Sequence, residues 1–166
     1  MKEHQVDVSV SITPVSASQA PNAAQTEELL RQARAAAARA YAPYSRFRVG
    51  AAALLDNGQI VSGCNQENAA YPSGLCAERV TVFYANSRYP EAKVLRLLIC
   101  AETDNGPVIS PITPCGACRQ SLLEKETAQG LPIFITLAGA NELYHLPKGI
   151  ASLLPLTFVK DSLEGK

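Results

Sequence analysis

The chain has 166 residues, 47% of them hydrophobic, which suits one domain with a buried core and leaves no room for two ordinary domains. Lysine plus arginine and aspartate plus glutamate number 15 each, so the chain lacks the basic field that holds a nucleic-acid polymer. No apolar run approaches the length of a bilayer span, and the first residues lack an apolar signal core, which disfavours membrane and secretory classes.

The first part of the chain, residues 1–22, is predicted to be an extension that precedes a main domain at residues 23–166. Apolar and polar residues alternate from Val6 to Ile12, the period of a half-buried strand, and Thr13-Pro14 is expected to end that strand. The stretch from Ser16 to Asn22 is small, polar and contains a proline, as is typical of a linker.

A helix and a hairpin are predicted next. The chain from Thr26 to Tyr41 is rich in alanine, leucine and arginine and opens on a good N-cap residue, so we expect a helix whose alanine face packs closely on a sheet. Two apolar runs, 47–55 and 59–65, flank Asp56-Asn57-Gly58, and an Asn-Gly turn between such runs strongly favours a β-hairpin.

A polar segment from Asn65 to Tyr71 follows the hairpin and leads into a second helix, predicted from Cys76 to about Ser87. Asn65 and Glu67 at such a junction either bind hydroxyl groups of a ligand or cap a turn, and residue type alone leaves both readings open. The apolar face of this helix is expected to consist of Val80, Phe83 and Tyr84.

The remaining elements alternate between strands and helices. Two almost wholly apolar runs, 94–101 and 131–138, predict strands buried on both faces, and a helix is expected between them from Cys115 to about Thr127. This order is that of an α/β domain. A short strand at 143–146 and a helical turn at 150–154 complete the prediction, and the apolar end of the chain should pack against something, for example a partner subunit.

Three cysteines predict a metal site. Cys115 and Cys118 stand at i and i+3, so their sulfurs project from one face of the first turn of a helix that begins after a proline, and Cys76 supplies a third thiolate. Zinc takes four ligands in structural sites, whereas three protein ligands leave a position for water. Because neither His4 nor His145 stands at ligand spacing, we expect three thiolates and an open catalytic position.

Two neighbouring residues fit roles around that metal. Glu78 follows Cys76 by two residues and is placed to exchange protons with a water molecule at the metal, as a general acid/base. Arg79 is the nearest cation that could offset the negative charge of three thiolates.

Other uses of these cysteines were weighed. A lone Cys-x-x-Cys pair occurs in redox proteins and in structural sites with four cysteines. The additional Cys76-Ala77-Glu78 and Pro114-Cys115 make both readings much less favourable, since neither gives Glu78 a task. The five cysteines are odd in number and three serve as thiolates, which favours a reducing, cytoplasmic location.

With these motifs in place, the chain resembles the homotetrameric cytidine deaminases of the cytidine and deoxycytidylate deaminase family. The resemblance runs in order from Thr26 to Phe158 and leaves the first twenty-odd residues outside. The matching stretches are Tyr41 to Ala52, Gly63 to Tyr71, Cys76 to Arg79, Pro114 to Gln120 and Leu153 to Pro155.

The resemblance implies a three-layer α/β/α fold with a central mixed sheet of five strands, to which the N-terminal strand would be extra. It implies one Zn²⁺ per subunit, held by Cys76, Cys115 and Cys118, with Glu78 shuttling protons. The positions that match substrate contacts are Asn65 and Glu67 for the ribose, the backbone of Ala77 and Thr113 for the pyrimidine, Phe47 for the base, Ala69 and Tyr71 for the sugar 5′-hydroxyl in an adjacent subunit, and Phe158 for a neighbour's site. The segment 105–112 is longer than is usual in the family.

The implied activity is the zinc-dependent hydrolysis of cytidine and 2′-deoxycytidine to uridine or deoxyuridine and ammonia in pyrimidine salvage. The expected partners are a nucleoside and three further copies of the chain, without a nucleic-acid polymer or a membrane. The alternatives are a deaminase of a modified cytosine nucleoside, such as a nucleoside antibiotic, and a non-catalytic zinc-binding module, which would not need Glu78.

Overall fold

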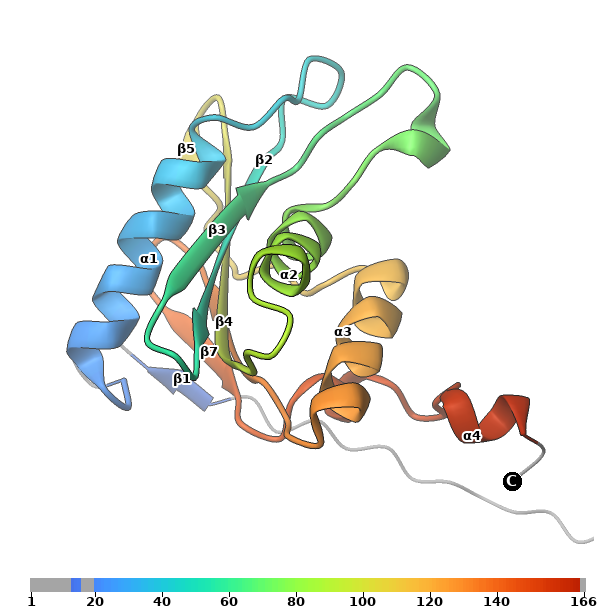
Figure 1. Ribbon diagram of the computed structural model, residues 1–166. Coiled ribbons are helices and arrows are strands. Elements are labelled where there is room, and N and C mark those ends of the chain that lie inside the picture. The colour runs from blue at the N-terminus through green and yellow to red at the C-terminus, as the bar shows by residue number, and fades with distance from the viewer. Residues whose placement is uncertain (1–12, 16–19, 165–166) are drawn as a thin grey trace, which may run out of the picture.

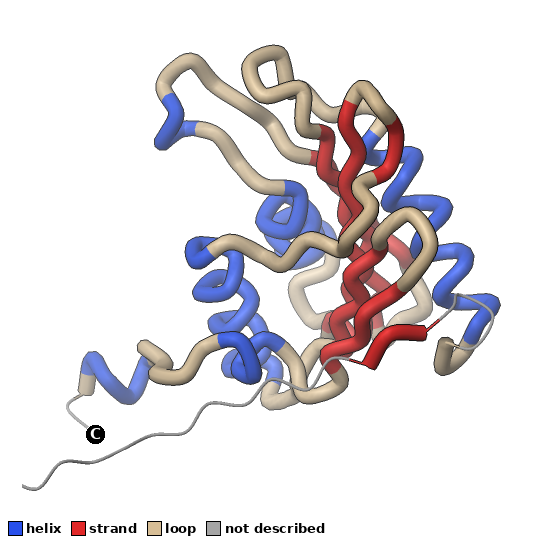
Figure 2. The backbone as a smooth tube through the Cα atoms, turned by 180° about the vertical axis from the view of Figure 1, so that it is seen from behind, coloured by secondary structure: helices blue, strands red, loops and turns tan. Residues whose placement is uncertain are grey.

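The computed structural model describes residues 13–15 and 20–164, which form a mixed β-sheet with helices on both faces (Figures 1 and 2). The strands are β1 (Thr13–Val15), β2 (Arg48–Leu55), β3 (Ile60–Cys64), β4 (Val94–Thr103), β5 (Gly106–Pro107), β6 (Phe134–Ala138) and β7 (Leu143–Leu146). The helices are α1 (Ala23–Ala37), α2 (Ala77–Arg88), α3 (Gly116–Gln129) and α4 (Lys160–Leu163), with 3₁₀ turns at Tyr71–Ser73 and Ile150–Leu153.

The sheet has the strand order β1-β7-β6-β4-β2-β3, with β5 folded back onto β4. Strands β4 and β6 are parallel, and the other pairs are antiparallel. Helix α1 lies on one face, while α2 and α3 lie on the other (Figure 1). The three-layer α/β/α prediction is confirmed, and β1 and β5 add to the five expected strands; β5 lies within the long segment 105–112.

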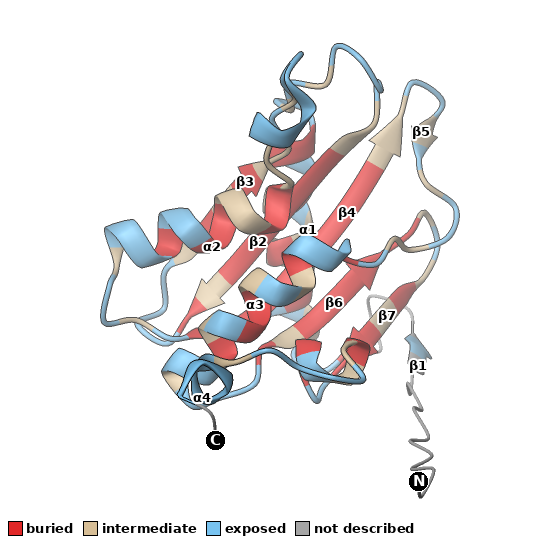
Figure 3. Ribbon diagram, turned by 90° about the vertical axis from the view of Figure 1, so that its right-hand side faces the viewer, coloured by how far each residue is buried: buried red, intermediate tan, exposed pale blue. Residues whose placement is uncertain are grey.

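The hairpin forms as predicted and β4 contains the predicted run 94–101, whereas β6 occupies only Phe134–Ala138 of the run predicted at 131–138. Strands β2 and β3 pair antiparallel, and Gly58 in their turn has a φ of 81°, a conformation that glycine adopts without strain. Strand β4 is buried from Arg96 to Ala101, with a helix layer on each side (Figure 3). Two helical layers need apolar residues on both sides of the strand, which explains its continuous apolar sequence.

Helix α1 differs from its prediction at both ends. It begins at Ala23, with Asn22 at the N-cap, so Thr26 lies inside the first turns and is not the cap. Thr26 is fully buried, its hydroxyl donates to the carbonyl of Pro21 at 3.3 Å, and it accepts a bond from Arg96 at 2.9 Å. The threonine therefore serves a tertiary contact. The helix ends at Ala37, before the expected Tyr41.

The alanine face of α1 packs on the sheet as predicted. Ala33, Ala36 and Ala37 are buried, and Gly50 of β2 lies directly beneath them. A side chain on Gly50 would overlap the carbonyl oxygen of Ala33 and come within 2.7 Å of the nitrogen of Ala37. Small residues on both partners thus allow the helix and the strand to approach closely.

The predicted apolar face of α2 is wrong for Phe83 and Tyr84, whereas Val80 is half-buried and packs near Gly63 of β3. Phe83 and Tyr84 are 46% and 51% exposed, whereas the buried residues are Ala77, Glu78, Thr81, Val82 and Ala85. Helix α2 approaches β3 so closely that a Cβ on Gly63 would come within 2.8 Å of the Thr81 hydroxyl oxygen. Only small or slender side chains fit that contact, so the two aromatic rings face outward.

The strand predicted from Val6 to Ile12 lies outside the described residues, but the prediction that Thr13-Pro14 ends a strand is wrong. Thr13–Val15 is itself strand β1, paired antiparallel with β7 through the partners Thr13 and His145. Proline is tolerated there because β1 is an edge strand. The boundary between residues 22 and 23 stays a prediction.

The C-terminal segment carries α4 away from the rest of the fold (Figure 1). Leu156 and Phe158 are 81% and 58% exposed, so packing of this apolar end against a partner also stays a prediction. Among the described residues, no helix combines the length and apolar character needed to traverse a bilayer.

Candidate metal centre and adjoining pocket

The three predicted cysteine ligands meet where α2 and α3 begin. Cys76 is the N-cap of α2 and Cys115 is the N-cap of α3, while Cys118 is buried in the first turn of α3. Each N-cap carbonyl accepts a bond from the first helical turn, from Val80 at 3.1 Å and from Arg119 at 2.9 Å. The positive ends of both helices therefore lie next to the sulfurs, where they favour thiolates.

The spacing of the sulfurs fits zinc. The sulfur of Cys115 lies 3.8 Å from that of Cys76 and 3.5 Å from that of Cys118, and all three lie within 4.8 Å of one another. Tetrahedral zinc with its usual bond lengths to sulfur needs neighbouring sulfurs about 3.8 Å apart. No histidine, carboxylate or fourth cysteine joins this cluster in the part of the chain that the structure describes. A metal held here keeps a coordination position for a non-protein ligand.

Contacts among the sulfurs and Arg79 prepare Cys76 for a metal. Hydrogen bonding with Cys118, and then with Cys115 and Arg79, lowers the pKa of the Cys76 thiol to about 5, although burial acts in the opposite direction. The contact with Cys76, together with burial, raises the pKa of the Cys118 thiol. The cluster therefore favours a thiolate at Cys76, the protonation state that a metal ligand needs.

Arg79 supplies the positive charge beside the sulfurs. Burial alone would lower the pKa of its guanidinium, but the sulfurs of Cys76 and Cys118 raise it. One terminal nitrogen lies 3.4 Å from the carbonyl of Gly74, whereas the buried Nε has no hydrogen-bond partner among the described residues. A buried N–H without a partner among the described residues, near the sulfurs of Cys76 and Cys118, fits a site built to hold negative charge.

Glu78 lies in the first turn of α2 and is only 4% exposed. Burial raises the pKa of its carboxyl, and the negative charge of Cys76 acts in the same direction. A carboxyl with a raised pKa exchanges protons more readily near neutral pH than an exposed one, which suits a general acid/base.

A pocket of about 490 Å³, a size typical of sites for small ligands, reaches Cys76, whereas Cys115, Cys118 and Glu78 are not part of its wall. Five of the residues predicted for the site contribute to its wall, namely Asn65, Glu67, Tyr71, Cys76 and Arg79. The other lining residues are Tyr44, Ser45, Gln66, Asn68, Gly74 and Leu75. The pocket thus joins the polar segment after β3 to the start of α2.

Other predicted contact residues lie outside the wall of this pocket. Phe47 is half-buried and packs against the hydrophobic core, and Ala77 is fully buried at the start of α2. Thr113 and Ala69 are exposed. Phe158 lies on the C-terminal segment, where its carbonyl accepts a bond from Gln120 at 2.8 Å. The roles predicted for these residues in substrate binding stay predictions.

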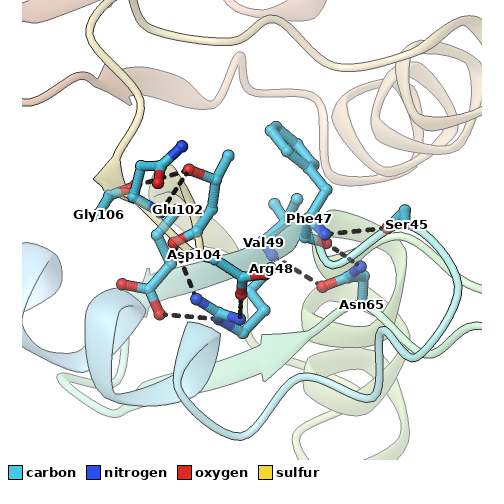
Figure 4. A network of polar contacts seen from close by, with 10 residues as sticks. Ser45, Phe47, Arg48, Val49, Asn65, Glu102, Asp104 and Gly106 are labelled. Carbon is cyan, nitrogen blue, oxygen red and sulfur yellow. Dashed lines mark hydrogen bonds and ion pairs between the residues drawn. The ribbon is translucent and has the colours of Figure 1, made fainter.

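Asn65 holds the start of β2 in place. Its amide oxygen accepts a bond from the nitrogen of Val49 at 2.7 Å, and its amide nitrogen donates to the carbonyl of Phe47 at 2.9 Å (Figure 4). Glu67 accepts bonds from the backbone nitrogens of Tyr44 and Ser45, at 2.9 and 3.3 Å, and from the Ser45 hydroxyl. Both side chains therefore act as caps for the segment before β2, one of the two readings that the sequence allowed.

Sequence reasoning missed Tyr44 and Ser45 as parts of the pocket. The rings of Tyr44 and Tyr71 meet edge to face with their centroids 6.4 Å apart, so the two tyrosines bring opposite parts of the wall together. Both residues lie in the stretch from Tyr41 to Ala52, which was recognised as part of the family resemblance. The positions of hydroxyl side chains in a loop do not, however, follow a pattern that would indicate a binding role.

Comparison with protein families gives a match over residues 23–130 to the cytidine and deoxycytidylate deaminase zinc-binding region. The chain is 39% identical over 138 residues to a cytidine deaminase of Sporosarcina psychrophila, covering 82% of this chain and 93% of that relative. It is 43% identical over 132 residues to a cytidine deaminase of Mycobacterium tuberculosis, covering 77% of this chain and 85% of that relative.

Solved structures agree with these matches. A cytidine deaminase from Burkholderia pseudomallei superimposes with a TM-score of 0.65 at 34% identity, over 80% of this chain and 98% of that one. The Mycobacterium tuberculosis enzyme superimposes with a TM-score of 0.61 at 37% identity, over 80% of this chain and 95% of that one.

Proposed function

The chain belongs to the cytidine and deoxycytidylate deaminase family, and from that premise we propose that it hydrolyses cytidine and 2′-deoxycytidine to uridine or deoxyuridine and ammonia, as a step of pyrimidine salvage. The observation that carries the proposal is the buried carboxyl of Glu78, which interacts with Cys76 and Cys118, two members of a three-sulfur cluster whose spacing fits zinc. A structural zinc site would need a fourth protein ligand and would give Glu78 no role.

Cys76, Cys115 and Cys118 would hold one zinc ion per subunit. When bound there, zinc lowers the pKa of a water molecule and so provides a nucleophile at neutral pH. Arg79 and the N-termini of α2 and α3 offset the negative charge of the sulfurs. Ligands that must stay reduced also support a cytoplasmic location for the enzyme.

Glu78 would move each proton of the reaction. Its carboxylate takes a proton from the attacking water and passes it to ring nitrogen 3 while oxygen bonds to carbon 4 of the cytosine. It then takes the proton of the new hydroxyl group and delivers it to the exocyclic amine, which leaves as ammonia. One carboxyl serves both transfers, and a raised pKa lets it act as base and as acid.

Asn65 and Glu67 would bind the sugar, and Phe47 with the backbone of Ala77 and Thr113 would bind the base. The support for the sugar contacts is that both side chains line the pocket beside Cys76. A neutral chain also suits a free nucleoside better than a polymer.

A homotetramer with shared sites belongs to the same proposal, with Ala69, Tyr71 and Phe158 reaching an adjacent subunit. Large exposed apolar side chains support it, since Phe83, Tyr84, Leu156 and Phe158 have no cover within the described chain. Sedimentation of the purified protein measures the assembly, and a monomer at working concentration would contradict this part.

The function is tested by ammonia release from cytidine with the zinc-loaded protein, before and after treatment with a chelator. We expect release that the chelator abolishes and that added zinc restores. The Cys76→Ser variant serves as a control, because it should stay inactive when zinc is added. A folded, zinc-loaded protein that releases no ammonia from cytidine or 2′-deoxycytidine would contradict the proposal.

A further inference from the structure

We propose that Ser45 is a positioning residue that orients the carboxylate of Glu67 toward the sugar of the substrate and ties it to the backbone before Phe47. This inference rests on the proposed function, since it assigns Glu67 a sugar hydroxyl as its ligand. Ser45 itself need not touch the substrate.

The hydroxyl of Ser45 links two parts of the site. Its oxygen accepts a bond from the nitrogen of Phe47 at 3.0 Å, and its proton is donated to Oε1 of Glu67. The link to Phe47 is visible in Figure 4. Oε2 of the same carboxylate accepts the backbone N–H groups of Tyr44 and Ser45. Both carboxylate oxygens are therefore fixed by residues 44 and 45.

The backbone around Ser45 makes this link possible. Arg46 has a φ of 55°, a left-handed conformation that is uncommon for a residue other than glycine. The turn at Arg46 brings the nitrogen of Phe47 back to the Ser45 hydroxyl. Beyond it, Asn65 holds Phe47 and Val49, so the chain that presents Ser45 is anchored immediately after the turn.

A second anchor lies on the other side of β2. Arg48 donates to Asp104 at 3.0 Å and to the carbonyl of Thr103 at 2.9 Å, which ties the start of β2 to the end of β4 (Figure 4). These contacts hold the strand but do not reach Glu67. Ser45 is thus the side chain through which the anchored segment reaches the carboxylate.

The electrostatics of Glu67 fit a sugar ligand. The hydrogen bond from Ser45 is the largest cause that lowers the pKa of the Glu67 carboxyl, and the bonds from Tyr44 and Ser45 nitrogens add to it. An ionised carboxylate offers about four acceptor sites, of which the segment uses three. A hydroxyl group is a donor that could take the remaining site, and Glu67 lines the pocket where it would approach.

The test compares cytidine with 2′,3′-dideoxycytidine, which lacks the 2′- and 3′-hydroxyls that we propose as ligands of Glu67 and keeps the 5′-hydroxyl. We expect Ser45→Ala to lower kcat/KM for cytidine about tenfold, the effect of weakening one hydrogen bond to a charged group, and to change kcat/KM for the dideoxy substrate by less than about twofold. Ser45→Thr keeps the hydroxyl and should recover most of the loss.

Ser62→Ala is the matched control, because it removes a serine hydroxyl on β3 at the surface beside Arg31 and Arg39, outside the pocket that contains Cys76. It should leave both substrates unaffected. Equal losses of Ser45→Ala on both substrates would overturn the proposal in favour of a general loss of loop structure, and an unchanged value for cytidine would overturn it as well.

The contact can also be tested without turnover, by carbon NMR titration of the Glu67 carboxyl. Its pKa should rise in Ser45→Ala and return toward the original value in Ser45→Thr. A pKa that does not rise overturns the contact by itself. A zinc-loaded wild-type protein that releases no ammonia instead defeats the proposed function, so the two failures are distinguishable.

Discussion

At the start of α2, neighbouring residues meet very different surroundings within one helical turn. Cys76 sits at the N-cap beside the other sulfurs, Ala77 is fully buried, and the carboxyl of Glu78 is buried with its pKa raised. Arg79 keeps a buried N–H without a partner among the described residues. The residues proposed as metal ligand, proton carrier and neighbouring cation are thus placed close together by neighbouring positions at one helix start.

The first prediction concerns Glu78. Glu78→Gln preserves the size of the side chain but cannot carry a proton, so we expect kcat to fall by about 10² to 10⁴-fold while zinc content and fold are kept. Turnover of cytidine and metal analysis of the same sample measure the two effects. Glu27→Gln, on the exposed side of α1, should behave as wild type, and near-normal turnover of Glu78→Gln would refute the role.

The second prediction concerns the buried carboxyl of Glu126, which accepts the backbone nitrogens of Ile133 and Ile150, both at 2.9 Å. Burial raises its pKa in the folded protein above the unfolded value of about 4.3. The stability that this group contributes is therefore fully present below that unfolded value and is lost as pH rises through the folded-state pKa.

As pH rises from about 4 to 8, the Tm of Glu126→Gln should therefore increase relative to the Tm of the wild type. Thermal unfolding of both proteins across this range measures the shift. Glu91→Gln removes an exposed carboxyl and should follow the wild type at every pH. A Tm difference that stays constant with pH, or that increasingly favours the wild type as pH rises, would contradict the raised pKa of Glu126.

Sequence alone could predict a role for those residues whose side chains take part in few kinds of site. Cysteine spacing and the carboxylate of Glu78 point to zinc because few other arrangements use them together. Ser45 gave no such signal, since its role depends on the left-handed turn at Arg46 and on Glu67, which is distant in sequence. Sequence likewise could not show what the side chain of Asn65 contacts, because its partners are backbone atoms at the start of another strand.

At the scale of elements, the sheet and its hairpin follow directly from sequence pattern, but helix faces and ends do not. Thr26 has the chemistry of a cap, yet it is used to bond a buried arginine of β4. Phe83 and Tyr84 are apolar, yet the close approach of α2 to Gly63 leaves room only for smaller side chains. In each case a tertiary contact overrides a local preference, and that contact cannot be read from the helix alone.

The third prediction tests the close packing of α1 on β2. Gly50→Ala should destabilise the fold by about 1–3 kcal/mol, because its Cβ would overlap backbone atoms of α1 that cannot move away independently. Gly116→Ala makes the same chemical change where no atom lies within 4 Å of the new Cβ, so it should cost far less. Denaturant unfolding measures both variants, and equal stabilities would show that the helix yields without cost.

At the scale of the whole molecule, the sulfur cluster connects two helices that are distant in sequence. Cys76 precedes α2, Cys115 precedes α3 and Cys118 lies in α3, so a metal ion held by all three would join the two helices of one layer (Figure 3). The metal should therefore contribute to stability as well as to catalysis, because it binds the folded arrangement and not the separated ligands.

The fourth prediction is that removal of zinc lowers Tm by about 5–10 °C, which corresponds to the few kcal/mol gained from a ligand well above its Kd. Calorimetry with and without a chelator measures the effect, and added zinc should reverse it. Cys76→Ser, already lacking a ligand, should respond much less to the chelator. An unchanged Tm of the wild type after complete removal of zinc would contradict a linking role.

The pairing of β1 with β7 joins two segments that lie far apart in the sequence. Thr13 lies beside His145, so the earliest described strand can pair only after the segment that contains β7 has been synthesised. The β2–β3 hairpin, in contrast, has both of its strands within residues 48–64 and can close early. Closing β1 onto β7 therefore costs more chain entropy than closing the β2–β3 hairpin, because a much longer stretch of chain separates the paired strands.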